Sequence, residues 1–188
     1  MENTHEQQLE LISEMIDSAR KEFSDDSFIY LLWGWAVCLA ALGEYVLMQI
    51  NYPHHYIVWI SMPVVAVIQI FFLSARKKNE KVKSHMDRIL GYVWMAVGIN
   101  IAAVLFSQHS LQNNTYPVLI LLYGIGTFIS GGIMRHKPMM MGAACCWAIG
   151  FAAFFFAFEY QLLLLSLSVI VSYIIPGHML KNRFRKNV

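Results

Sequence analysis

The sequence predicts an all-α integral membrane protein in which six transmembrane helices form three tandem antiparallel hairpins behind an amphipathic N-terminal helix. Three observations predict this class. The chain is 57% hydrophobic and only 14% charged, with a mean hydropathy of +0.50, which is more apolar than an ordinary soluble domain. Its apolar residues gather into blocks long enough to cross a bilayer. Its basic residues occur only in alternate connections between those blocks.

Each apolar block holds about 18 to 21 residues, and a helix of that length spans the roughly 30 Å of the hydrocarbon core. We therefore expect residues 27–188 to form one membrane domain. The predicted spans are 28–48, 56–73, 89–106, 117–134, 139–158 and 162–180.

The distribution of Lys and Arg predicts the orientation. All 14 precede the first span, join the second to the third or the fourth to the fifth, or follow the sixth. The other three connections contain none. Under the positive-inside rule, both termini are cytoplasmic and the chain is a multi-pass protein of the bacterial inner membrane, in contact with its lipids.

Residues 1–26 are predicted to form an amphipathic cytoplasmic or interfacial helix. The segment is too long and too acidic at its start for a cleaved signal peptide. Its apolar residues follow helical spacing at Leu9, Ile12, Met15, Ile16, Ala19 and Phe23. The helix either rests on the membrane surface or on its own loops, or residues 1–23 dock a protein partner or a second copy.

An internal repeat suggests the hairpin arrangement. The segments "WAVCLAAL", "MAVGINIA" and "WAIGFAAF" align, with Ala36, Ala96 and Ala148 in register and Ala40 and Ala152 four residues after the first and last of these. Small residues at this spacing let membrane helices approach closely, so these alanines are candidate packing positions. Chance similarity among apolar segments is the alternative interpretation.

One carboxylate interrupts the first span. At about 1.5 Å per residue, Glu44 lies about 24 Å from Phe28 and thus close to the external headgroups. We expect it to reach for water, as side chains near an interface do. The alternative is an external metal or proton site of unknown metal, formed by Glu44, His54, His55, His109 and Glu159.

Four polar residues are predicted to lie deeper in the bilayer: Asn100, Thr127, Ser166 and Ser168. Buried polar side chains in membranes find partners on neighbouring helices, and such bonds account for their presence. The alternative is a polar path for a small solute or ion.

The sequence offers no catalytic set, cofactor motif or nucleic-acid-binding motif beyond the basic loops. Cys38, Cys145 and Cys146 all lie within predicted spans and indicate no disulfide framework.

The acidic leader, the segment "SDDSFIYLLWGW" after it and the ending "YIIPGHMLK" resemble those of a group of small six-helix bacterial inner-membrane proteins. The resemblance covers most of the chain and implies no activity. The three hairpins are also similar, in architecture alone, to acid-resistance membrane proteins built from short helical repeats.

Three functions follow as hypotheses. The first is a non-enzymatic membrane protein that acts by oligomerisation or by regulating a membrane or cytoplasmic partner. The second is a small transporter or channel. The third is a membrane enzyme, or a metal- or pH-responsive site, that uses the external Glu and His residues.

Overall fold

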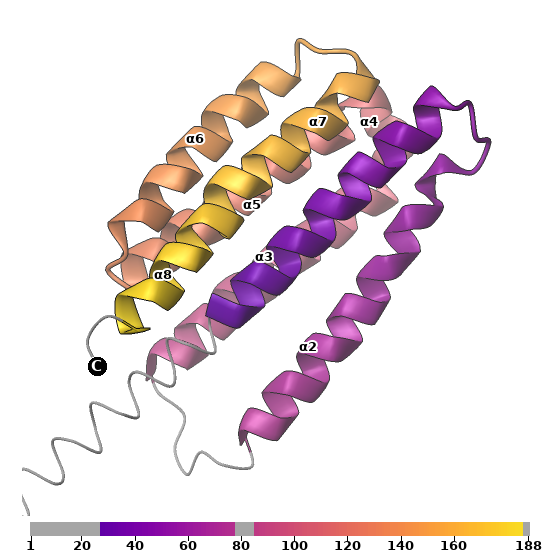
Figure 1. Cartoon of the computed structure of the whole chain (residues 1–188). Coiled ribbons are helices and arrows are strands. Elements are labelled where there is room, and N and C mark those ends of the chain that lie inside the picture. The colour runs from indigo at the N-terminus through magenta and orange to yellow at the C-terminus, as the bar shows by residue number, and fades with distance from the viewer. Residues whose placement is uncertain (1–26, 78–84, 186–188) are drawn as a thin grey trace, which may run out of the picture.

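A computed structural model describes residues 27–77 and 85–185, and all the regular secondary structure in these ranges is helical (Figure 1). The predicted amphipathic leader, residues 1–26, lies outside the described residues. The prediction of an all-α protein is confirmed for the described part of the chain.

The first described helix runs over Ser27–Gln49. After a turn, the short 3₁₀ segment η1 (His55–Ile60) continues into α2 (Ser61–Lys77). The next elements are α3 (His85–Phe106), α4 (Gln108–Leu111), η2 (Gln112–Asn114) and α5 (Thr115–Ile133). The last four are α6 (Lys137–Ala153), α7 (Phe158–Val169), η3 (Ile170–Ile174) and α8 (Ile175–Arg185).

Five continuous helical segments are long and apolar enough to cross a membrane: 27–49, 55–75, 88–106, 108–133 and 158–182. The remaining predicted span corresponds to α6, which has 17 residues and is therefore about 25 Å long. The membrane-protein class is thus supported by five helices, while the count of six spans stays a prediction.

The predicted end of the span at 139–158 is wrong. Helix α6 stops at Ala153, residues 154–157 form the turn, and α7 begins at Phe158, so "EYQ" belongs to the first turn of α7 rather than to the connection. Glu159 suits that position because a helix N-terminus favours negative charge. The Gln161 amide donates to the Phe156 carbonyl over 3.0 Å and closes the turn.

Long helices that follow one another in the chain run antiparallel. The Trp33 indole N–H donates to Gln69 Oε1 over 2.7 Å, and the rings of Phe28 and Phe72 are 4.6 Å apart, so the 27–49 helix and α2 pair in opposite directions. Helices α5 and α6 pair in the same way, as do α6 and the α7–α8 segment (Figure 1).

Glycines mark the closest helix contacts. A Cβ added at Gly142 in α6 would lie 2.6 Å from the Val171 carbonyl oxygen, and one added at Gly150 would lie 2.8 Å from Leu121 in α5. The 27–49 helix approaches η3 at Gly34, where an added Cβ would lie 3.0 Å from Ile174. Small residues at these contacts let the backbones come together, as in other membrane helices.

The predicted packing alanines divide into two groups. Ala40 is buried and Ala36 is half-buried, whereas Ala96, Ala148 and Ala152 are exposed. Within this chain, the closest helix contacts of α6 therefore lie at other residues, Gly142 and Gly150 among them.

Helices α2 and α3 lie at the outside of the bundle, where α2 stands apart from the rest (Figure 1). In the most apolar stretch of the 55–75 span, only 6% of the residues are buried. The corresponding share is 11% in the 88–106 span and 50% in the 108–133 span. Their exposed apolar side chains suit contact with lipid.

A π-helical turn, η3, interrupts the last long helix just before Pro176. Proline lacks the N–H that would bond the carbonyl four residues earlier, and a π-helical turn is one way for a helix to absorb that loss. Tyr173 lies in this turn and is buried in the bundle.

Candidate functional site

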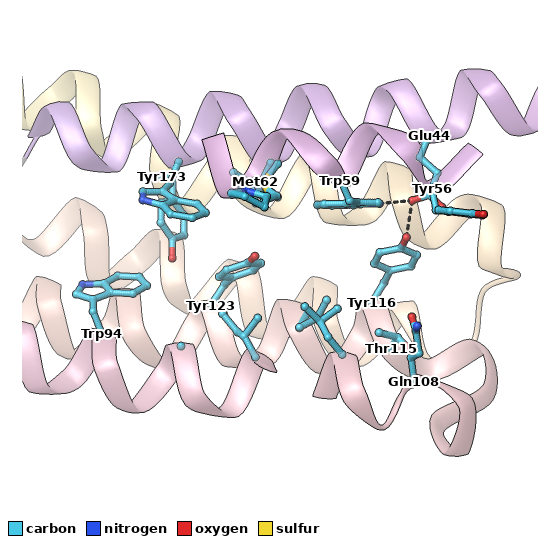
Figure 2. Close-up of a pocket in the computed structure, with 18 of the residues that line it drawn as sticks. Glu44, Tyr56, Trp59, Met62, Trp94, Gln108, Thr115, Tyr116, Tyr123 and Tyr173 are labelled. Carbon is cyan, nitrogen blue, oxygen red and sulfur yellow. Dashed lines mark hydrogen bonds between the residues drawn. The ribbon is translucent and has the colours of Figure 1, made fainter. Parts of the chain in front are cut away.

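A cavity of about 1620 Å³ lies between the 27–49 helix, α2, α3, α5 and the α7–η3 segment. Figure 2 shows its side chains pointing inward from these elements. Nine aromatic residues line it: Tyr30, Trp33, Tyr56, Trp59, Trp94, Tyr116, Tyr123, Phe158 and Tyr173.

The cavity opens between α2 and α3. Ile60, next to the start of α2, and Met95 of α3 both line it, and they are 66% and 61% exposed. Because both helices present apolar outer faces, this opening faces the lipid when the helices span a bilayer. A molecule dissolved in the membrane could enter without crossing water.

The aromatic lining forms two clusters. The outer cluster contains Trp59, Tyr116 and Phe158, with ring centroids 6.1 Å apart for Trp59–Tyr116 and 5.2 Å for Tyr116–Phe158. The inner cluster contains Tyr30, Trp94, Tyr123 and Tyr173, whose neighbouring rings are 5.8 to 6.1 Å apart. Figure 2 shows Trp59 and Tyr116 beside Glu44, and Trp94 and Tyr173 at the far end.

Glu44 lies at the outer cluster and is only 2% exposed. His55 Nδ1 is 2.8 Å from its Oε1, while the Trp59 indole N–H donates to Oε2 over 2.6 Å. The Tyr116 hydroxyl also donates to Oε2 (Figure 2). The expectation that this carboxylate reaches for water is therefore wrong, because protein donors from η1 and α5 replace the water.

One hydrogen bond joins Glu44 to His55. It runs through Oε1, because Oε2 already accepts from Trp59 and Tyr116. When neutral His55 donates its ring proton to the ionised carboxylate, the pair carries one negative charge.

Of the five predicted external residues, the structure brings Glu44 and His55 into direct contact. His109 lines the same cavity. His54 instead contacts the Tyr56 hydroxyl at 3.0 Å, and Glu159 is exposed and accepts from the Gln49 amide over 3.4 Å. Among the described residues, no group of three or more His, Cys, Asp or Glu side chains could hold a metal ion.

The four predicted midplane residues do not line the cavity. Asn100 is exposed on α3 and donates to the Ala96 carbonyl of its own helix over 2.9 Å. Ser166 and Ser168 are buried and donate to carbonyls of their own helix, Leu162 and Leu165, over 3.1 and 2.7 Å. Thr127 is fully buried in α5.

Sequence reasoning missed Trp59 and Tyr116. Trp59 follows Glu44 across a short turn, so an antiparallel register between the two helical segments of that hairpin could have suggested their contact. Tyr116 is separated from Glu44 by 72 residues, and no local pattern points to their meeting.

Comparison with protein-family models, curated proteins and solved structures finds no match to this chain.

Proposed function

We propose that this chain is a non-enzymatic membrane protein that binds an amphipathic small molecule taken from the lipid. The observation that carries the proposal is the cavity of about 1620 Å³, which is aromatic along its length and holds one buried carboxylate at one end. Ligand pockets are typically about 300 to 1,000 Å³, mostly apolar, with a few placed polar groups. This cavity has the composition of such a site, and its volume exceeds the typical range.

Apart from Gln69 of α2, the amide and imidazole side chains of the lining gather near Glu44. Gln108, His109, Gln112 and Asn113 come from the α4–η2 connection, next to the start of α5. The opposite end is lined by Leu73 of α2, Leu90 of α3 and the inner aromatic cluster. This gradient favours a ligand with one polar end and an apolar body.

The association hypothesis stays compatible with this function, because a bound ligand could alter how the chain contacts a partner or a second copy. Its predicted docking element, residues 1–23, lies outside the described residues.

Transport is the second candidate. The specific observation in its favour is that the cavity extends along the bundle. Its lining runs from Glu44, near one end of the helices, to Leu73 and Leu90, near the other end. A flux assay in proteoliposomes distinguishes it from binding alone.

Filling the cavity tests the proposed function. Gly98 of α3 lines the cavity, and a Cβ added there meets nothing within 4 Å. We expect Gly98→Phe to weaken saturable binding of the neutral fluorophore N-phenyl-1-naphthylamine by about tenfold or more, equivalent to about 1.4 kcal/mol. Tryptophan-sensitised emission in nanodiscs measures this, because Trp33, Trp59 and Trp94 line the cavity.

Gly132→Phe is the matched control. Gly132 also has open space around its Cβ position but lies outside the cavity lining. Equal affinities of the two variants, after subtraction of empty nanodiscs, would contradict the proposed function.

A further inference from the structure

We infer that the outer end of the cavity binds the cationic group of an apolar cation that lacks N–H donors, of the quaternary ammonium or phosphonium class. This inference rests on the proposed function and names the ligand class.

Charge selects a cation. Glu44 is the one acid in the cavity lining, and that lining contains no Lys or Arg among the described residues. The carboxylate is only 2% exposed, so screening is weak and its charge acts strongly on its neighbours. An anionic ligand would find no Lys or Arg in the described lining and would be repelled by the ionised carboxylate.

The aromatic rings define the kind of cation. Both oxygens of Glu44 already accept hydrogen bonds from protein donors, so a ligand ammonium with N–H groups would have to displace one of them. The rings of Trp59 and Tyr116 are stacked at 29° beside the carboxylate (Figure 2). Aromatic faces attract cations that offer no hydrogen bond, as in known sites for quaternary ammonium groups.

Tetraphenylphosphonium and tetraphenylborate test the sign of the charge, since they match in size and differ in charge. Equilibrium dialysis against full-length protein in zwitterionic nanodiscs, with empty nanodiscs subtracted, measures both. We expect saturable binding of the cation that exceeds that of the anion by about tenfold or more. Glu44→Gln should weaken cation binding by about tenfold, whereas Glu159→Gln, outside the cavity lining, should leave it unchanged.

Two results would overturn the inference: equal binding of the two probes, or cation binding unaffected by Glu44→Gln. If the neutral fluorophore still binds and Gly98→Phe still blocks it, the proposed function survives without this ligand class. If no probe binds above empty nanodiscs, both fail.

Discussion

Replacing Glu44 with leucine is expected to destabilise the protein by about 3 kcal/mol or more. The substitution leaves the Trp59 indole N–H and the Tyr116 hydroxyl without the carboxylate that accepts from them. Each buried donor that loses its partner costs about 1 to 3 kcal/mol. His55 adds less, because 31% of its side chain is exposed and can reach water. Unfolding in mixed detergent–SDS micelles, followed by circular dichroism, measures the change.

Glu44→Gln is the matched control. Glutamine keeps the size and one acceptor oxygen for Trp59 and Tyr116, while its amide can donate to His55 Nδ1 in the other tautomer. We expect it to cost about 1 kcal/mol or less. If the Glu44→Leu and Glu44→Gln variants unfold at the same SDS fraction, the hydrogen bonds of Glu44 with His55, Trp59 and Tyr116 do not stabilise the fold.

The second large effect is expected at Gly142 of α6. A Cβ there would lie 2.6 Å from the Val171 carbonyl oxygen and 3.0 Å from Ser172 Cα. Because both contacts are with backbone, Gly142→Leu must push α6 away from η3. Overpacking of this kind typically costs about 1 to 3 kcal/mol, and we expect the upper end of that range or more.

Gly132→Leu isolates this steric effect. Gly132 also belongs to a helix, in the last turn of α5, but a Cβ added there meets nothing within 4 Å. Replacing a helical glycine removes backbone freedom from the unfolded chain, so this variant should be neutral or stabilised by up to about 1 kcal/mol. A similar loss of stability in both variants would show that the α6–η3 contact is not the cause.

Two residues show how far sequence reasoning reached into the site. The candidate set of external acids and histidines contained Glu44 and His55, which do meet at 2.8 Å. It also contained Glu159 and His54, which bond elsewhere. The depth of a residue along a span follows from counting, but its direction around the helix depends on which neighbours pack there.

Asn100 illustrates the same limit. Its depth along the third predicted span made it a candidate for a polar path, yet it lies on the exposed face of α3 and bonds to its own helix. The turn at residues 154–157 was also missed, because it contains three phenylalanines and no Gly or Pro. Apolar aromatic residues signal a span by composition even where the backbone turns.

The sequence by itself determined that this chain is helical and apolar enough for a membrane, and it placed the basic residues in alternate connections. Those properties depend on the length of apolar runs and on the order of charges along the chain, which are local quantities. Only the tertiary structure decided that Glu44 is buried, that Trp59 and Tyr116 donate to it, and that aromatic side chains surround a cavity beside it. These contacts depend on the rotation and spacing of several helices at once, which no single segment of the chain encodes.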